Sequence, residues 1–203
     1  MLSLDHLAVA CTDLGQGVAW VEKSLGVTLQ PGGQHLRYGT YNMLLGLADG
    51  LYLEVIAKDP DAAPYDGPSW FALDEFSGRP RLANWICRTD DMDATRKQAP
   101  VSVGPARDLI RGDLRWRITV PDDGSLPFEG AYPTLVQWAD GTQHPAARLP
   151  DSGCRLTSFD VTHPTADAIQ NMLDLPDARV GFHVGPAAFS ATFATPVGER
   201  VLM

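Results

Sequence analysis

Two stretches of this chain, residues 4–57 and 83–138, repeat one order of predicted elements, and that repeat constrains the fold more than any other feature. Each stretch contains a strand, a helix capped by an aspartate, a second strand, an Asp-Gly turn and a final strand. Sequence identity between the stretches is low, so element order and turn positions support the comparison. We therefore predict two similar α+β modules whose sheets join into one curved, mainly antiparallel surface.

The ends of the predicted helices give the clearest local signals. In the first stretch Asp13 precedes an apolar stripe at helical spacing, with Gln16 as its capping-box partner and Gly26 ending the helix. In the second stretch Asp91 caps a helix that runs to about Ala99.

The rest of the chain divides around these two stretches. We predict a loop at residues 31–33 and a strand from about Leu36. Aromatic and leucine side chains at helical spacing over 70–76 predict a short bridging helix, with a lid over a site as the alternative. The tail repeats part of the unit, with a helix capped by Thr165. The predicted divisions are a first module, a linker with a short helix, a second module and a partial third module, at residues 1–57, 58–82, 83–145 and 146–203.

The composition of the chain limits the classes of molecule that the protein is expected to bind. The net charge is −9, which argues against nucleic acid and anionic membranes, because both attract clustered positive charge. Apolar runs are too short to span a bilayer, and the N-terminus lacks the pattern of a secretory signal. Three widely spaced cysteines fit a reducing compartment. We expect a cytoplasmic protein with a small-molecule ligand and no nucleic-acid or membrane partner, and leave a homodimer open.

Polar residues inside apolar strands mark the candidate site. His6 and Glu54 lie in the first and last strands of the first stretch, and burial of such groups without partners is costly. Aligning the second stretch on the first puts Asn84 opposite His6 and Gln137 opposite Glu54. Strand alternation gives His6 the face that lies away from the helices. A metal, a ligand or a hydrogen-bond network would satisfy these side chains.

At this point the chain resembles the vicinal-oxygen-chelate superfamily, and within it the glyoxalase-like domain proteins. No single motif is very specific, but the order of all six segments is. The segments are LDHLAVACTDL (4–14), GTYNMLL (39–45), GLYLEVIA (50–57), LANWICRTDDM (82–92), LRWRI (114–118) and LVQWADGTQHP (135–145). The resemblance implies paired βαβββ modules that form a cup-shaped mixed sheet with helices outside, the glyoxalase/bleomycin-resistance/dioxygenase fold.

The resemblance also implies a divalent metal at the base of the cup, with no organic cofactor. The implied ligands are His6, Glu54, Asn84 and Gln137. The two amides depart from the usual pattern of a second histidine and a second carboxylate. Amides bind hard cations weakly, and Zn²⁺ prefers other donors. The identity of the metal stays open.

Further residues are candidates for catalysis and substrate binding. Glu54 is a candidate proton-transfer base, and His144 is a candidate acid that could fold back over the cup. Thr40 and Asn42 share one strand face and are candidates to line the site. Arg88 and Arg117 are candidates to bind a substrate carboxylate, because a guanidinium matches its geometry. The sequence leaves open whether Arg115 and Arg117 or Trp116 faces the cup.

Two functions remain open at this stage. One is an enzyme of the lyase or isomerase type acting on a small, oxygenated, anionic molecule, with or without a metal. The other is a metal-free protein that sequesters a small molecule, as bleomycin-resistance proteins do. The intact His6–Glu54 pair favours the enzyme, and the two amides favour the metal-free binding protein. The fold alone does not decide between these two functions.

Overall fold

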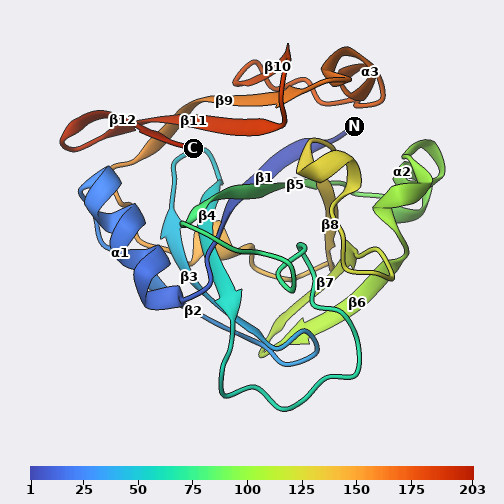
Figure 1. Cartoon of the computed structure of the whole chain (residues 1–203), viewed down its shortest axis with the longest axis horizontal. Helices are drawn as coiled ribbons and strands as arrows, with labels where there is room; N and C mark the ends of the chain where they lie inside the picture. Colours follow the sequence, from blue (N-terminus) through green and yellow to red (C-terminus); the bar gives the residue numbers. More distant parts are fainter.

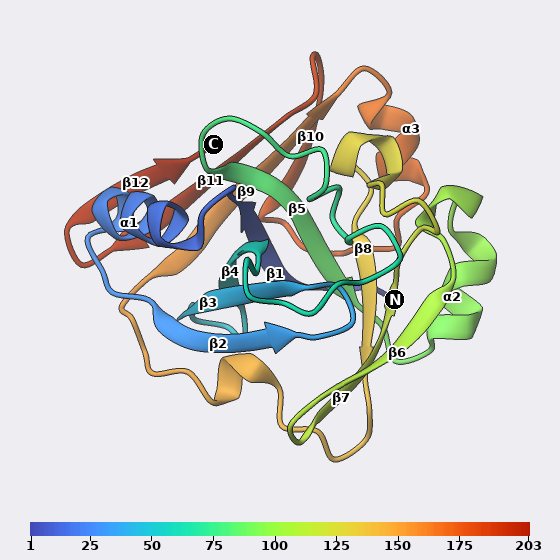
Figure 2. The same ribbon diagram turned by 60° about the horizontal axis from the view of Figure 1, so that its bottom comes forward.

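A curved eight-stranded sheet forms the body of the protein. The structure is a computed structural model that describes all 203 residues. Strand order in the sheet is β2-β3-β4-β1-β5-β8-β7-β6, and Figures 1 and 2 show that the sheet is strongly curved. The strands are β1 (Ser3–Ala10), β2 (Gln30–His35), β3 (Thr40–Gly46), β4 (Tyr52–Lys58), β5 (Arg81–Arg88), β6 (Ala106–Arg111), β7 (Leu114–Thr119) and β8 (Thr134–Trp138).

The two halves of the sheet are related by a local two-fold at the antiparallel pair of β1 and β5. In each half, the first strand pairs in parallel with the last, as β1 does with β4 and β5 with β8. The remaining neighbours are antiparallel. This confirms the predicted pair of modules with a mixed, mainly antiparallel sheet.

Helices cover the convex face, as expected. The first is α1 (Leu14–Leu25), whose cap Asp13 accepts a hydrogen bond from the backbone of Gln16 and whose end is the left-handed Gly26. The second is α2 (Met92–Gln98), capped in the same way by Asp91. Single turns of 3₁₀-helix occur at η1 (Val101–Val103), η2 (Pro127–Gly130) and η3 (Pro145–Ala147).

A second, four-stranded sheet packs against the convex face of the first (Figure 1). Its order is β10-β9-β11-β12, so its pairing differs from that of the two modules although its elements follow the same sequence. Trp85 of β5 meets Phe159 of β9 at 5.5 Å between ring centroids, within one large hydrophobic core. The elements are β9 (Arg155–His163), α3 (Ala166–Asn171), β10 (Val180–Val184), β11 (Ala188–Thr195) and β12 (Gly198–Leu202).

Three local predictions were wrong. Residues 31–33 lie in β2 instead of a loop, and Leu36 lies in an exposed turn instead of a strand. β2 is an edge strand with a register irregularity between Pro31 and Gln34, and sheet edges tolerate Pro and Gly. The segment over 70–76 forms turns instead of a helix, because Phe71 and Ala72 adopt left-handed backbone angles that interrupt any helix.

The linker between the two modules closes the cup. Its chain, teal and green in Figure 1, runs into the space that the sheet surrounds. Trp70, Phe71 and Leu73 are buried there, in a second hydrophobic cluster with residues of the concave face. These linker side chains therefore fill much of the cup.

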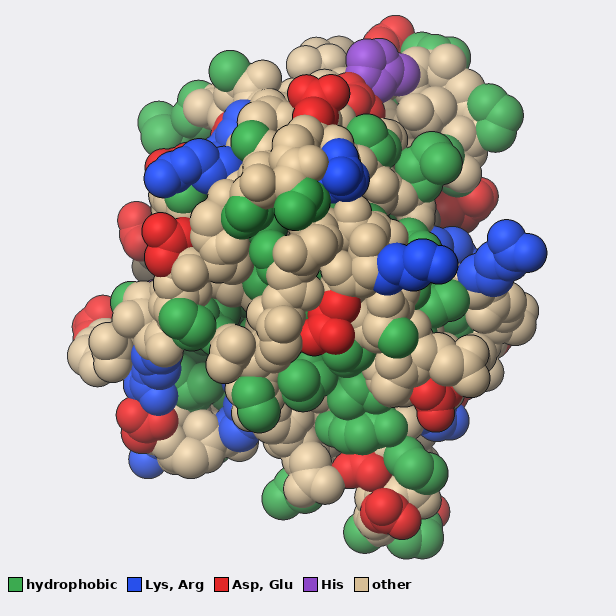
Figure 3. Space-filling view, turned by 90° about the vertical axis from the view of Figure 1, so that its left-hand side faces the viewer, with side chains coloured by type: hydrophobic (Ala, Val, Ile, Leu, Met, Phe, Trp, Pro, Cys, Tyr) green, Lys and Arg blue, Asp and Glu red, His purple; other side chains and the backbone are tan.

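Charged side chains of both signs lie on the surface of the protein. The face in Figure 3 carries acidic and basic side chains interspersed, with no continuous basic patch. None of the helices has the length and apolar character needed to cross a bilayer.

Packing of α1 against the sheet predicts a contrast between two glycines of this helix. A Cβ on Gly17 would lie 2.4 Å from Cys11 Sγ and 2.8 Å from Val55, whereas one on Gly15 would meet only Asp13 Oδ1, at 3.3 Å. Gly17→Ala should lower the free energy of unfolding by about 1–3 kcal/mol, because the helix must move off the sheet. Gly15→Ala should be close to neutral. Urea unfolding of both variants measures this, and equal effects would contradict the packing argument.

Candidate functional site

The polar side chains on the concave face gather around one small cavity. Its free volume is about 30 Å³, enough for roughly one or two water molecules. Apolar walls come from the sheet and from Trp70 and Phe71 of the linker. Its polar lining consists of His6, His35, Asn42, Tyr52, Glu54 and Arg111.

His6 and Glu54 form the centre of this group. They lie on the parallel neighbours β1 and β4, where Ala8 is the register partner of Glu54. His6 Nε2 is 3.6 Å from Glu54 Oε2, and both side chains are buried. Asn42 on β3 donates its amide to Glu54 Oε1, which leaves Oε2 directed at the histidine. The predicted neighbourhood of His6, Glu54 and Asn42 is therefore present in the structure.

Asp5 fixes the orientation of His6. A carboxylate only accepts, so His6 donates from Nδ1 to Asp5 Oδ1 at 2.6 Å and turns Nε2 to the cavity. Asp5 Oδ2 also accepts from Trp138 Nε1 and His144 Nε2. β1 has a register shift between Leu4 and His6 where it pairs with β5. Such a bulge redirects side chains, which explains how two consecutive residues meet on one side of a strand.

A second polar group lies across the cavity. Arg111 Nη1 donates to His35 Nε2 at 2.9 Å, so the proton of a neutral His35 is on Nδ1, which faces Thr40 Oγ1 at 3.1 Å. Thr40 also accepts from Trp70 Nε1, and thereby ties the linker to this group. Arg111 places a guanidinium at the wall of the cavity. Its strand β6 was not predicted, and His35 had no sequence context that distinguished it.

The pKa values of His6 and Glu54 are shifted in opposite directions. Burial alone would lower the pKa of His6, but its contacts with Asp5 and Glu54 outweigh burial and raise it above 6.5. Burial alone would raise the pKa of Glu54, but His6 and Asn42 lower it to about 2. Asp5 has a pKa well below its usual range despite its burial, because His144 and His6 donate to it. A histidine with a raised pKa therefore faces a carboxylate with a lowered pKa.

The structure corrects the predicted positions of the second module. Gln137 lies on the convex side of β8, where it bonds the backbone of Met92 and Asp90 at the start of α2. Because Ala8 and Ile86 are equivalent across the two-fold, their partners Glu54 and Thr134 are equivalent as well. The counterpart of the His6–Glu54 pair is thus Asn84 with Thr134, joined by a 2.9 Å hydrogen bond.

Three other candidates do not reach the cavity. Arg117 is paired with Asp93 and Asp108 at the surface, while Trp116 of the same strand faces the cup. Arg88 is partly exposed, with Nη1 3.7 Å from Asp5 Oδ2. His144 lies behind Asp5 and does not line the cavity, so it orients Asp5 and has no direct path to a ligand. Strand parity could not foresee these placements, because loops and neighbouring acids determine them.

The donors in the cup do not fit the implied divalent metal. His6 and Glu54 are the two matching donors, and no group of three or more His, Cys, Asp or Glu side chains is arranged to hold an ion. Asn84 uses its amide nitrogen on Thr134 and its oxygen on the backbone of Trp85. Gln137 is on the other face. Arg111 adds a fixed positive charge to the cavity, which opposes a cation there.

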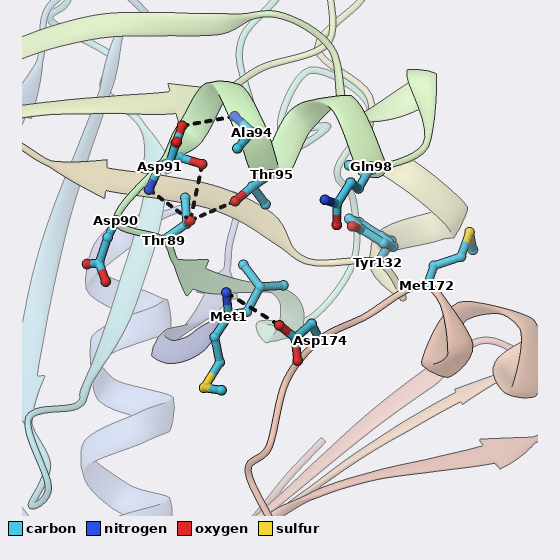
Figure 4. A pocket seen from close by; sticks show the side chains of 12 residues that line it. Met1, Thr89, Asp90, Asp91, Ala94, Thr95, Gln98, Tyr132, Met172 and Asp174 are labelled. Atoms are coloured by element: carbon cyan, nitrogen blue, oxygen red, sulfur yellow. Dashed lines mark hydrogen bonds and ion pairs between the residues drawn. The ribbon is translucent and has the colours of Figure 1, made fainter.

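A hollow of about 250 Å³ lies outside the cup, between α2 and the segment after α3 (Figure 4). Its polar groups bond one another, as Figure 4 shows for Thr89 with Thr95 and for the N-terminus with Asp174. Asp91 is used as the cap of α2. The cavity in the cup, with its buried acid and base, is therefore the candidate site.

The lowered pKa of His35 predicts that the folded protein loses stability in mild acid. Burial, with a contribution from Arg111, lowers the pKa of His35 from 6.5 to about 4. Between these values the unfolded chain binds a proton that the folded chain does not, so stability is lost as pH falls from 6.5 towards 4. The contribution is up to about 3 kcal/mol.

Urea unfolding at pH 7 and pH 4.5 tests this prediction. His35→Gln should lose less stability between the two pH values than the parent chain, and His183→Gln, at an exposed position, should behave like the parent. If His35→Gln keeps the full pH dependence, His35 is not its source.

Comparisons with known proteins agree with the fold. The sequence matches the family described as glyoxalase-like domain over residues 4–175. A hypothetical protein from Staphylococcus aureus has a similar structure, with 15% identity over 92% of this chain and 86% of that one, at a TM-score of 0.63. The methylmalonyl-CoA epimerase of Mycobacterium tuberculosis is 22% identical over 66% of this chain and 85% of that one, at a TM-score of 0.42, too loose to inform the site.

No curated protein matches the chain in sequence. The family match extends from β1 to beyond α3 and covers both modules and the whole cup. This chain belongs to the glyoxalase-like domain family of the vicinal-oxygen-chelate superfamily.

Proposed function

We propose that the chain is an enzyme of the isomerase or lyase type that moves a proton on a carbon next to a carbonyl group, in a small organic acid. One observation supports this above the others: His6 and Glu54 are buried 3.6 Å apart with pKa values displaced in opposite directions. Pairs of titratable groups whose pKa values are driven apart are typical of acid–base sites. A binding protein has no need for such a pair.

Each partner has a distinct role in the proposed reaction. Glu54 Oε2 accepts the proton from carbon, while Asn42 holds Oε1 and so fixes the carboxylate plane. His6, as an imidazolium stabilised by Asp5, gives its Nε2 proton to the product, and the neutral imidazole then takes the proton from Glu54, which restores both groups. Proton removal leaves negative charge on the carbonyl oxygen.

Arg111 supplies the positive charge across the cavity. Its guanidinium is held by His35 and is 3.4 Å from Asn42 Oδ1, so it is oriented before a ligand binds. A preorganised cation is suited to a substrate carboxylate or to the oxygen that gains charge. The proposed steps use side chains only and involve no metal.

Deuterium exchange tests the proposed reaction. In D₂O the protein should exchange the C3 hydrogens of small 2-oxo acids, as observed by proton NMR. Glu54→Gln should reduce the rate by about 100-fold or more, because the amide cannot accept the proton. Tyr41→Phe, at a half-buried position away from the cavity, is the control. Binding without exchange by the parent chain would favour a sequestration protein instead.

The binding of organic anions should depend on Arg111 and should not depend on Arg117. Arg111→Ala should weaken the binding of 2-oxo acids by about 10-fold or more, since a charge-assisted hydrogen bond contributes roughly 1.5–3 kcal/mol. Arg117→Ala should leave binding unchanged, because its partners are surface aspartates. Calorimetric titration measures both variants, and the opposite order of effects would refute the assignment of Arg111.

A further inference from the structure

A large apolar groove lies directly behind the wall of the cavity. Its volume is about 520 Å³, within the range of small-molecule sites, and ten of its thirteen lining residues are hydrophobic. The linker, the start of β5, the segment around η2 and the C-terminal sheet all contribute to it. Its apolar surface includes Phe71, Phe76, Leu82, Leu126, Phe189 and Met203.

Phe71 is the partition between the groove and the cavity. Its side chain lines both spaces. The cavity itself has about 30 Å³ of room, so an organic molecule enters only if part of its wall moves. On the far side of Phe71 there is open volume to receive either the displaced ring or a part of the ligand.

Phe71 has fewer anchoring contacts than its neighbour Trp70. Trp70 is anchored by its hydrogen bond to Thr40 and stacks on Tyr38, whereas Phe71 has no polar group and stacks on Trp70 at 4.6 Å. The backbone φ of Phe71 is +58° and that of Ala72 is +53°, in a region that L-residues avoid.

The opposite wall of the groove also contains two residues with left-handed backbone angles. Phe128 and Glu129 of η2 have φ values of +51° and +55°. Two strained pairs therefore border one groove, and strained backbone concentrates at functional sites.

The charges at the rim indicate an uncharged occupant. Arg81 lies over the ring of Phe76 at 4.1 Å and donates to the carbonyls of Ser77 and Arg79. The other charged lining residues are Glu75 and Glu129, which would repel an anion. The groove thus offers apolar surface without a free positive charge.

We infer that the substrate is amphipathic: its acidic head binds Arg111 with the reacting carbon at Glu54 and His6, and its uncharged alkyl or aryl chain passes Phe71 and lies in the groove. This inference rests on the proposed function and names the substrate class for that site. Phe71 then determines specificity, because its ring must swing aside for any substrate with a chain.

A homologous series of straight-chain 2-oxo acids, from pyruvate to 2-oxodecanoate, tests the inference by calorimetric titration. Each methylene that enters the groove should tighten the dissociation constant roughly fourfold. Ala188→Trp, at an exposed position that lines the groove on β11, should abolish this gain and leave pyruvate binding unchanged. Ala194→Trp, exposed on the same strand but outside the groove, should match the parent chain.

A second variant tests the partition itself. Phe71→Ala removes the ring that must move, so association of the long-chain acids should accelerate by about tenfold or more in stopped-flow tryptophan fluorescence. Affinity that is independent of chain length, equal effects of the two tryptophan variants, or association unchanged in Phe71→Ala would each overturn the inference.

The exchange assay separates this inference from the proposed function. Chain-length-dependent binding without deuterium exchange supports the groove and refutes the proton transfer. Exchange that does not depend on chain length supports the proton transfer and refutes the groove. If no member of the series binds, both are refuted.

Discussion

The buried carboxylate of Asp5 is the interaction on which the site depends. Its side chain has no exposed surface, and three donors from distant segments satisfy it: His6 on β1, Trp138 on β8 and His144 before η3. An unpaired charge at this depth would be strongly unfavourable, so the strands and the loop that supply the donors must take up fixed positions. The same contacts set which nitrogen of His6 faces the cavity and hold its proton. Fold and chemistry are thus coupled through one side chain.

Element order, turn positions and helix caps were readable from the sequence, because Asp13, Asp91 and the Asp-Gly turns act locally. His6, Glu54 and Asn42 were found because polar groups stand out in apolar strands. Gln137 was misplaced because a shift in strand alignment exchanges the two faces of a sheet, and Thr134 is the residue equivalent to Glu54. Asp5 was missed because a bulge breaks alternation. Arg111 and His35 depend on pairings between strands far apart in the chain, which local patterns do not encode.

The three similar units of the chain contribute different parts of the structure. The first supplies His6 and Glu54, while the matching positions of the second hold Asn84 and Thr134 in a closed hydrogen bond. The second instead contributes apolar wall from Trp116, Ile118 and Val136 and the cation of Arg111. The C-terminal sheet supports the convex face and borders the outer groove. Membership of the family fixes the architecture, and the substitutions within each unit decide what that architecture does.

The unequal halves of the cup have a stereochemical consequence. His6 and Glu54 project from adjacent parallel strands and approach the cavity from one side, and the related positions on the other side hold no acid or base. A planar enolate bound between the halves would meet the His6–Glu54 pair on one of its faces. If the His6–Glu54 pair performs the proposed reaction, proton transfer is suprafacial: the hydrogen leaves and returns on the same face. Inversion of a stereocentre, which needs a base on one face and an acid on the other, would require a cavity group other than the His6–Glu54 pair.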